Sequence, residues 1–262
     1  MDYLTPILDR KRRELARRQR HRSPTLGAAA LDDDRALLAV RALRRPAGDA
    51  PRVIAEIKRS SPSRGELRAR QHGDIELLAR EYVAGGAAAV SVLCDRPGFD
   101  GSPLDLRRAA RAVAVPLLFK EFVLDELQIR LARALGAHMV LLIVRALSPE
   151  RLIALTEATI AAGMAPVVEA ANAREVATAL ATRACIVGVN ARDLETFSVD
   201  TSAARGPLAS IPADRIAVHM SGVRTRADFM AVGSGRADAV LIGESLMCAE
   251  RPSQQLAELL RS

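Results

Sequence analysis

The run MVLLIV occupies residues 139–144 and consists of six apolar residues without a polar interruption. A strand that faces water on one side alternates apolar and polar residues, whereas a strand covered on both faces reads as a continuous apolar run. Strands of the second kind belong to parallel sheets whose faces are covered by helices. The run therefore predicts an α/β fold built on a parallel sheet.

Further β-rich runs lie on either side of this one and recur at intervals of about 20 to 35 residues. They are VIAEI (53–57), AAVSVL (88–93), PLLFK (116–120), APVVEA (165–170), CIVGVN (185–190), RIAVHM (215–220) and AVLIG (239–243). Segments between them, such as 127–135 and 174–180, carry apolar residues at helical spacing. Eight such units predict a closed (β/α)8 barrel, a TIM barrel, rather than an open doubly wound sheet, because no GxGxxG motif follows the first strand.

The length of 262 residues suits one barrel, so we expect a single domain over residues 1–262. Residues 1–50 precede the first strand and form an extra N-terminal helical segment, in which Leu4, Leu8 and Leu15 fall at helical spacing. No long apolar stripe or heptad pattern is present, which favours a monomer or a weak homodimer.

The net charge of +7 is concentrated in residues 10–22, which hold eight Arg or Lys and one Glu. The remainder sums to about zero, which is not the basic surface of a nucleic-acid-binding domain. Two interpretations of the basic segment remain, a solvated face of an amphipathic helix or a site for a polyanion, and we favour the first. No nucleic-acid partner is expected.

Other features of the composition exclude several further classes of protein. No apolar run approaches the roughly 20 residues of a membrane helix, and the first residues lack the apolar centre of a secretory signal, so we expect a cytoplasmic protein without a membrane partner. Cys94, Cys185 and Cys248 have no CxxC spacing. They are expected to be plain buried thiols, with no disulfide framework and no metal site.

Polar residues end several of the apolar runs, and the carboxyl ends of barrel strands are where barrel enzymes carry their chemistry. Glu56 and Lys58 are two residues apart, so they share one strand face and could form an ion pair or a proton-transfer pair. A carboxylate that ends an apolar run must be paired, solvated or raised in pKa, and Glu169 is such a residue. The residues at or just after strand ends are Glu56, Lys58, Lys120, Glu169, Asn190, Ser221 and Gly243.

The segments SGVRT (221–225) and LIGES (241–245) follow the seventh and eighth strands. Barrels commonly bind phosphate there, with exposed backbone N–H groups of glycine and the start of a short helix. Gly222, Gly243 and the adjoining Glu244 are therefore candidate phosphate-site residues.

Motifs along nearly the whole chain resemble the indole-3-glycerol-phosphate synthase family. The matching segments are ILDRKRREL (7–15), IAEIKRSSPSRGEL (54–67), SVLCDRPGFDGSPLDL (91–106), PLLFKEFVLDELQI (116–129), GAHMVLLIVRAL (136–147), VVEAANAREVATAL (167–180), GVNARDLETFSVD (188–200), SGVRT (221–225) and ADAVLIGESLM (237–247). The resemblance implies a carboxy-lyase of tryptophan biosynthesis. Its substrate would be a small-molecule sugar phosphate, 1-(2-carboxyphenylamino)-1-deoxyribulose 5-phosphate, which is converted to indole-3-glycerol phosphate, carbon dioxide and water.

The resemblance also implies roles for individual residues. Lys120 would be the general acid that protonates the ketone during ring closure. Lys58 and Glu56 would assist loss of the hydroxyl, Glu169 would act as a general base, and Asn190 would hold a substrate hydroxyl. Each proton-transfer role is typically worth about 10² to 10⁴ in rate.

The resemblance extends to the substrate-binding residues and implies no metal and no organic cofactor. Phe122 would form a wall for the anthranilate ring, and Arg192 would complete the polar rim. The phosphate and substrate anchor would consist of Lys58, Ser61, Gly222 and Gly243, while Ser221 would belong to the catalytic set.

The sequence departs from the family pattern after the seventh strand, where Met220 stands in place of a usual Glu. Glu121, next to Lys120, replaces a common Asp. The neighbouring His219 could be a proton donor of the site, or a packed or solvated histidine at a strand end.

Three functions remain compatible with these observations. The retained acid and base residues favour the full synthase. Met220 favours a related barrel with an altered substrate, such as a modified anthranilate or a substrate like that of phosphoribosylanthranilate isomerase. A non-catalytic barrel that binds a phosphate sugar as a partner subunit would be expected to lose its acid and base residues, which are kept here.

Overall fold

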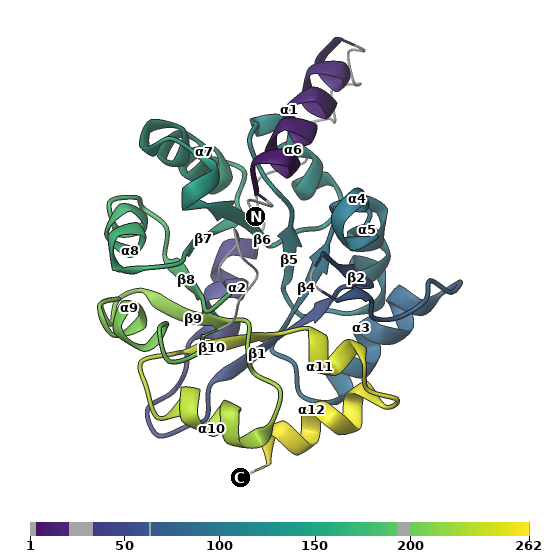
Figure 1. Cartoon of the computed structure of the whole chain (residues 1–262), viewed down its shortest axis with the longest axis vertical. Helices are drawn as coiled ribbons and strands as arrows, with labels where there is room; N and C mark the ends of the chain where they lie inside the picture. Colours follow the sequence, from purple (N-terminus) through teal and green to yellow (C-terminus); the bar gives the residue numbers. More distant parts are fainter. Residues whose placement is uncertain (1–3, 21–33, 63, 193–199, 262) are drawn as a thin grey trace.

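The computed structural model describes residues 4–20, 34–62, 64–192 and 200–261. Within these residues, strands β1, β10, β9, β8, β7, β6, β5 and β4 follow one another in that order around a closed barrel. Each strand is parallel to both of its neighbours, and β1 closes the ring by pairing with β10 and β4. Figure 1 shows the ring of helices around these strands. The predicted (β/α)8 barrel is confirmed.

The barrel strands lie within one residue of the predicted runs at each end. They are β1 (Arg52–Ile57), β4 (Ala89–Leu93), β5 (Leu117–Lys120), β6 (Met139–Ile143), β7 (Ala165–Ala170), β8 (Ile186–Asn190), β9 (Ile216–Met220) and β10 (Ala239–Ile242). A short hairpin, β2 (Ser60–Ser61) with β3 (Gly65–Glu66), follows β1 and was not predicted. Two-residue strands carry too little pattern to be recognised in a sequence.

The barrel strands bury both of their faces, which explains their continuous apolar runs. Leu141 and Ile143 of β6 point into the barrel and pack with side chains of other strands, such as Val167. Val140 and Leu142 point outward and pack beneath the helices. Because successive side chains of a strand point to opposite faces, each run divides its apolar residues between two cores.

Several of the helices that cover the barrel begin at side chains that cap them. Asp125 and Gln128 form a reciprocal capping box at the start of one helix, and Ser102 and Asn172 accept backbone N–H groups at the start of two others. These helices are α3 (Asp74–Ala84), α4 (Arg96–Phe99), α5 (Pro103–Ala112), α6 (Glu126–Ala134), α7 (Pro149–Ala161), α8 (Ala173–Leu180), α9 (Arg205–Ala209), α10 (Arg226–Gly233), α11 (Glu244–Met247) and α12 (Pro252–Leu260), with a 3₁₀ turn η1 (Val144–Ala146). No helix in the described ranges is long and apolar enough to span a membrane.

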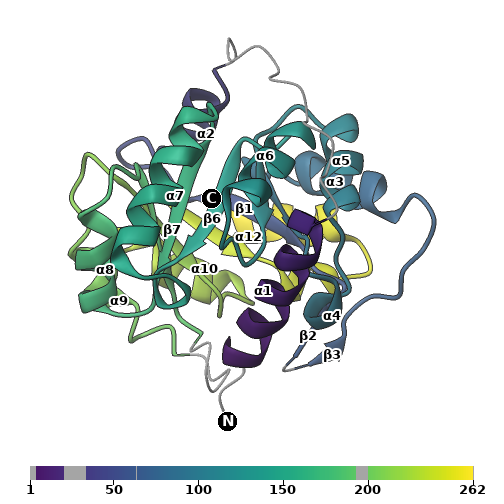
Figure 2. The same ribbon diagram turned by 90° about the horizontal axis from the view of Figure 1, so that it is seen from above.

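The N-terminal segment contributes two helices, α1 (Leu4–Arg20) and α2 (Arg35–Leu43), which lie at opposite ends of the barrel (Figure 2). Ala39 and Leu43 of α2 are fully buried in the cluster that fills the barrel. The guanidinium of Arg44 donates to backbone carbonyls of residues 213–215, just before β9 begins. Helix α2 therefore closes the end of the barrel where the strands start, which leaves the other end for chemistry.

The three cysteines differ in their exposure. Cys94 is buried, Cys185 is partly buried and Cys248 is exposed. The expectation of three buried thiols is therefore wrong for Cys248, because it follows the last turn of α11 at the surface. Burial raises the pKa of the Cys94 thiol well above its usual range, so this side chain is an unreactive core residue.

Candidate active site

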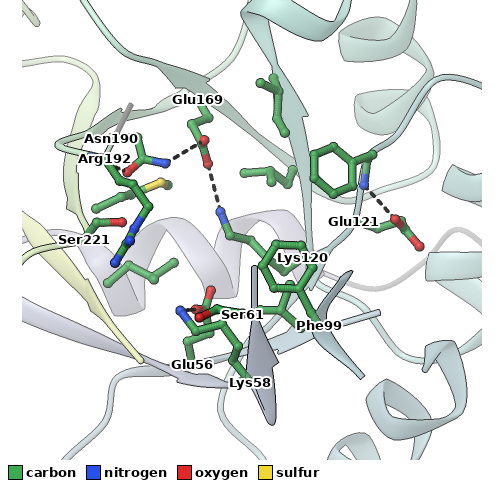
Figure 3. Close-up of a pocket in the computed structure, with 16 residues that line it drawn as sticks. Glu56, Lys58, Ser61, Phe99, Lys120, Glu121, Glu169, Asn190, Arg192 and Ser221 are labelled. Carbon is green, nitrogen blue, oxygen red and sulfur yellow. Dashed lines mark hydrogen bonds and ion pairs between the residues drawn. The ribbon is translucent and has the colours of Figure 1, made fainter. Parts of the chain in front are cut away.

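A pocket opens at the carboxyl ends of the strands, and most of the predicted site residues line it (Figure 3). Its polar lining comes from five strands or the residues that follow them. The predicted residues that the structure brings together here are Glu56, Lys58, Ser61, Lys120, Phe122, Glu169, Asn190, Arg192 and Ser221. Their convergence follows from the parallel barrel, in which all strands end on the same side.

Lys120, Glu169 and Asn190 form a chain of hydrogen bonds across the pocket. The Lys120 ammonium donates to Glu169 Oε2 at 2.8 Å, and Asn190 Nδ2 donates to Glu169 Oε1 at 2.9 Å. Asn190 Oδ1 accepts the backbone N–H of Arg192 at 3.0 Å. Both oxygens of Glu169 are thus occupied, and Asn190 holds this carboxylate in place beside the lysine.

The carboxylates around Lys120 keep its side chain protonated. Burial lowers the pKa of Lys120, but the negative charges of Glu169 and Glu56 outweigh this effect and hold the pKa above its ordinary value. Lys120 is therefore an ammonium ion at neutral pH. A proton donor of fixed position that is largely buried is suited to general acid catalysis.

Glu56 and Lys58 form the ion pair that their spacing allowed. Lys58 Nζ lies 3.0 Å from Glu56 Oε1, and both side chains are largely buried. Gly243 lies directly against this pair, because a Cβ atom at that position would be 2.8 Å from Glu56 Oε1. Glycine at residue 243 thus leaves room for the Glu56 carboxylate, which a larger residue would displace.

The opposite wall of the pocket is apolar. The rings of Phe99 and Phe122 have centroids 6.4 Å apart and planes inclined by 34°. Leu141 and Ile143 extend this wall from β6. Phe99 was not predicted as a site residue, although it lies shortly after the second barrel strand. The wall provides a slot suited to a flat aromatic ring.

Met220 also lines the pocket and is almost completely buried. Its thioether packs over Gly188 of the neighbouring strand β8, where any side chain would collide with it. The pocket wall is thus apolar at residue 220, and Glu169 and Glu56 are the carboxylates whose charges raise the pKa of Lys120.

His219 faces away from the pocket. It is 1% exposed on the outer face of β9 and lines a hollow beside α9 and α10, while its strand neighbours Val218 and Met220 point into the barrel. Burial lowers the pKa of the imidazole, so the ring is neutral. The hypothesis that His219 is a proton donor of the pocket is therefore wrong, and its interpretation as a packed histidine is confirmed.

A second hollow adjoins the pocket at the ends of β9 and β10, as the SGVRT and LIGES segments predicted. Lys58, Arg192, Gly222, Gly243 and Glu244 line it. The Ser61 hydroxyl lies nearby in the pocket, buried and without a hydrogen-bond partner among the described residues. Cationic side chains and an unpartnered hydroxyl are suited to an anionic group of a ligand.

Glu244 contacts three arginines at the rim of this second hollow. It accepts from Arg64 at 2.7 Å, and its carboxylate lies 3.5 Å from Arg192 and 3.4 Å from Arg224. Burial raises the pKa of Glu244, but these guanidinium groups outweigh it, so the pKa is lowered and the carboxylate stays ionised. Arg64 and Arg224 were not predicted, because nothing in their spacing indicates a shared partner.

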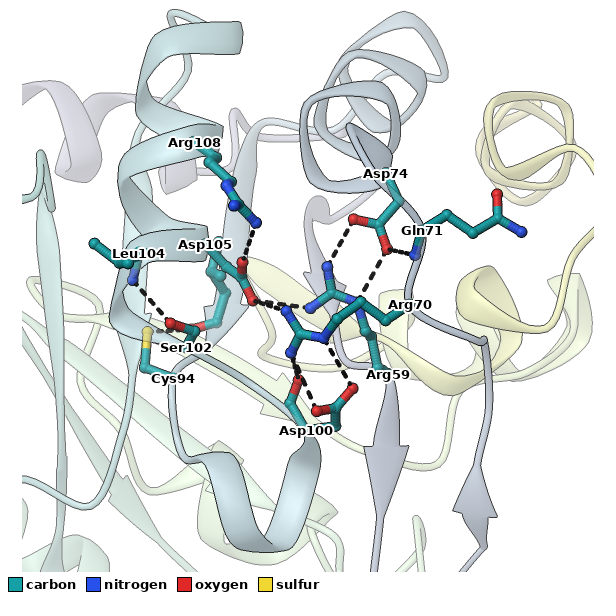
Figure 4. A network of polar contacts seen from close by, with 11 residues as sticks. Arg59, Arg70, Gln71, Asp74, Cys94, Asp100, Ser102, Leu104, Asp105 and Arg108 are labelled. Atoms are coloured by element: carbon teal, nitrogen blue, oxygen red, sulfur yellow. Dashed lines mark hydrogen bonds and ion pairs between the residues drawn. The ribbon is translucent and has the colours of Figure 1, made fainter.

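A buried ion triad anchors the end of β1 just beyond Lys58 (Figure 4). Arg59 donates to both oxygens of Asp74 at 3.0 and 2.7 Å, and to Asp105 Oδ2 at 2.8 Å. All three side chains are at most 10% exposed. The guanidinium thus joins β1 to the first turns of α3 and α5 and fixes the backbone next to the lysine.

A second buried cluster fixes α1 over the pocket. Lys11 lies 3.0 Å from Glu121 and 3.1 Å from Asp95, and Arg10 donates to Asp95 at 2.8 Å. Glu121 also accepts the backbone N–H of Phe122 at 2.8 Å. The interpretation of the basic segment as a solvated face is therefore wrong for Arg10 and Lys11, which reach carboxylates at the ends of two barrel strands.

Comparisons with known proteins agree with this geometry. The family model described as "Indole-3-glycerol phosphate synthase" matches residues 4–259. A protein of that name from Streptomyces griseus is 41% identical over 261 residues, which cover 99% of this chain and 95% of the relative. "Indole-3-glycerol phosphate synthase 2" of Streptomyces coelicolor is 47% identical over 208 residues, covering 79% of this chain and 80% of the relative. Among solved structures, a mutant tryptophan synthase alpha-subunit from Pyrococcus furiosus has a TM-score of 0.59 at 13% identity, covering 81% of this chain and 98% of that chain, which shows the barrel fold alone.

Replacing the central cation of the triad tests its structural role. Arg59→Met leaves the carboxylates of Asp74 and Asp105 buried without their guanidinium, so we expect the free energy of unfolding to fall by about 3–5 kcal/mol. Urea unfolding measures this change. Arg108→Met is the matched control, because Arg108 contacts the same Asp105 at 3.2 Å from an exposed position, and its expected cost is about 0–1 kcal/mol. Equal losses in the two variants would contradict the anchoring role.

The buried carboxyl of Glu121 should make stability depend on pH. Burial raises the pKa of Glu121 to about 7, despite the nearby Lys11. A carboxyl with a raised folded-state pKa binds more protons when folded, so its stabilising contribution is full below the unfolded pKa and is lost as the pH rises through about 7. We expect the parent to lose more stability than Glu121→Gln between about pH 5 and about pH 8 in urea unfolding.

The control for this measurement is Glu14→Gln, which removes the more exposed carboxylate that contacts Lys11. It should keep the pH dependence of the parent. All three proteins retain His219, whose lowered pKa acts in the opposite direction, so the difference between parent and Glu121→Gln isolates Glu121. Parallel pH curves for these two proteins would show that Glu121 does not titrate in this window.

Proposed function

Because the chain belongs to the indole-3-glycerol phosphate synthase family, a family of decarboxylating lyases in tryptophan biosynthesis, we propose that its barrel mouth carries out the full synthase reaction. The substrate is 1-(2-carboxyphenylamino)-1-deoxyribulose 5-phosphate, and the products are indole-3-glycerol phosphate, carbon dioxide and water. The observation that carries this proposal is the protonated Lys120, held by Glu169 beside a slot for an aromatic ring.

Ring closure begins when the aromatic carbon that bears the carboxylate attacks the ketone carbon of the sugar chain. Negative charge develops on the ketone oxygen, and Lys120 donates its proton to that oxygen. Carbon dioxide then leaves, and the electron pair of the broken bond restores the aromatic ring. Phe99 and Phe122 orient the ring for this attack, since a held geometry lowers the entropic cost of closure.

Dehydration completes the indole. The new hydroxyl leaves as water, with a proton supplied by Lys58, which Glu56 holds in an ion pair at 3.0 Å. A proton is lost from the ring system to Glu169, which is a general base once Lys120 has given up its own proton. Asn190 keeps Glu169 oriented through this exchange, because its amide already donates to that carboxylate. All groups used here belong to the chain, so the proposed steps need no metal and no organic cofactor.

The phosphate of the substrate is anchored in the second hollow. Lys58 and Arg192 supply positive charge, Gly222 and Gly243 expose backbone, and the Ser61 hydroxyl is available as a donor. Arg64 and Arg224 lie at the same rim on Glu244, so they are further cations within reach of an arriving phosphate. This arrangement supports a sugar phosphate with its ring and phosphate ends in separate hollows.

A second candidate function has support from Met220. Its buried thioether makes the pocket wall apolar at the position where the family usually has a carboxylate. An apolar wall favours a substrate whose anthranilate ring carries an apolar substituent, because such a group gains from burial. This candidate shares the chemistry of the first and differs in the preferred ring.

The surroundings in which the enzyme works follow from the proposed reaction. The substrate is a small molecule, so we propose no nucleic-acid partner and no membrane partner. A cytoplasmic location suits a step of amino-acid biosynthesis. A monomer or a weak homodimer is sufficient, because every group that the proposed steps use comes from one chain.

Removing the proposed acid should abolish turnover. We expect Lys120→Ala to lower kcat by about 10² to 10⁴, measured by the fluorescence of the indole product. Lys120→Arg keeps the positive charge beside Glu169 but gives up a proton far less readily, so it should also be inactive while still binding substrate. Near-parental turnover in Lys120→Arg would show that charge alone, and not proton donation, drives ring closure.

Met220 should set the preference between rings. We expect the ratio of kcat/KM for a ring-methylated substrate to kcat/KM for the unsubstituted one to fall about tenfold in Met220→Glu, because a methyl group loses its apolar surroundings. Met220→Leu keeps an apolar side chain and should preserve the ratio. An unchanged ratio in Met220→Glu would remove the support for the second candidate function.

A further inference from the structure

The chain adopts an uncommon backbone conformation directly after β9. Ser221 has φ of 70° and Gly222 has φ of 86°, so two consecutive residues lie in the left-handed region. Glycine adopts this conformation freely, but serine does so at a steric cost. A non-glycine residue stays there only when its surroundings hold it. The contacts of the Ser221–Gly222 peptide must therefore hold Ser221 in this conformation.

The imidazole of His219 holds this peptide from outside the barrel. His219 Nε2 donates to the carbonyl oxygen of Ser221 at 2.9 Å. Since a carbonyl only accepts, the ring nitrogen that carries the proton in the neutral imidazole is Nε2. Because the ring lies behind the strand end and not in the pocket, it draws the Ser221 carbonyl toward the outside of the barrel.

The orientation of the carbonyl fixes the orientation of the next N–H. In a planar trans peptide, the C=O and the following N–H point in opposite directions. With the Ser221 carbonyl turned outward, the Gly222 N–H points toward the hollow that Gly222 lines together with Lys58 and Arg192. No acceptor for this N–H lies among the residues that the structure describes. It is a donor left free at the proposed phosphate anchor.

We propose that His219 is a positioning residue of this enzyme, which aims the Gly222 N–H at the phosphate of the substrate by holding the Ser221 carbonyl on the far side of the peptide. The inference rests on the proposed function for the identity of the anion. His219 does not touch the substrate. It acts through a single peptide unit, and its hydrogen bond is the only contact required.

Packing alone does not replace this hydrogen bond. The ring of His219 borders a hollow of about 440 Å³, which Leu208 of α9 and Val232 of α10 also line. The imidazole itself is only 1% exposed, so it is packed as well as hydrogen-bonded. A leucine at residue 219 is similar in size and keeps this packing, but it has no donor for the Ser221 carbonyl.

The test compares His219→Leu, which removes the donor, with His219→Gln, whose amide places a donor where Nε2 lies. We expect His219→Leu to raise the Kd for inorganic phosphate and the KM for the sugar phosphate by about tenfold, the worth of one well-aligned hydrogen bond, with kcat within about twofold. His219→Gln should restore most of the affinity. In amide NMR spectra, adding inorganic phosphate should shift the Gly222 signal in the parent and in His219→Gln, but much less in His219→Leu.

The matched control is His138→Leu. The His138 ring also contacts the backbone, accepting the Leu117 N–H at 3.3 Å, but it lies where β6 begins, at the other end of the barrel. It should leave phosphate affinity unchanged. An unchanged Kd in folded His219→Leu, or equal losses of kcat and affinity that His219→Gln does not repair, would overturn the positioning role.

Failure of the inference and failure of the proposed function give different results. The parent could turn over the sugar phosphate while its Gly222 amide signal does not shift on addition of phosphate. This result would overturn the inference and leave the proposed function standing. A phosphate-dependent Gly222 signal that His219→Leu abolishes, in a parent that forms no indole product, would support the inference and reject the proposed function.

Discussion

In the closed parallel barrel both faces of each strand are buried, so a charged side chain in the middle of a strand cannot reach water. Each strand packs one side against the barrel interior and the other against helices. Charged and polar side chains therefore gather where strands end, and the parallel direction puts all carboxyl ends on one side. Glu56, Lys120 and Asn190 occupy last or next-to-last strand positions for this reason. The position of the pocket follows from the closure of the sheet, and α2 seals the opposite end.

Burying these charges is costly, and the structure compensates each with a partner. A buried ion pair contributes little net stability because desolvation offsets the attraction, but removing one partner leaves a strongly destabilised charge. Such ion pairs instead fix the positions and the protonation states of the side chains that form them. Glu169 keeps Lys120 charged, Arg59 fixes the chain beside Lys58, and Lys11 ties α1 to the loop after Lys120. The residues proposed to exchange protons thus lie on backbone segments that are fixed by ion pairs of other residues.

The sequence was sufficient for the barrel and for most of the pocket, because burial on both faces leaves an unmistakable apolar run and strand ends mark the mouth. The sequence was insufficient for predicting ion pairs whose two residues lie far apart along the chain. A helical pattern shows that Lys11 is on a polar face, but it does not show that residues 95 and 121 lie opposite. Phe99 was missed because it ends α4, a four-residue helix too short to carry a periodic pattern. The outward position of His219 was available by alternation, since Met220 next to it ends the inward series.

The end of β9 illustrates what that alternation means for substrate recognition. His219 and Met220 are adjacent in sequence but lie on opposite faces of the strand. The inward side chain shapes the slot for the aromatic ring, while the outward one holds the peptide beside the phosphate hollow. The two side chains line different hollows, so the proposed control of ring preference and the proposed hold on the phosphate act through separate residues of one strand.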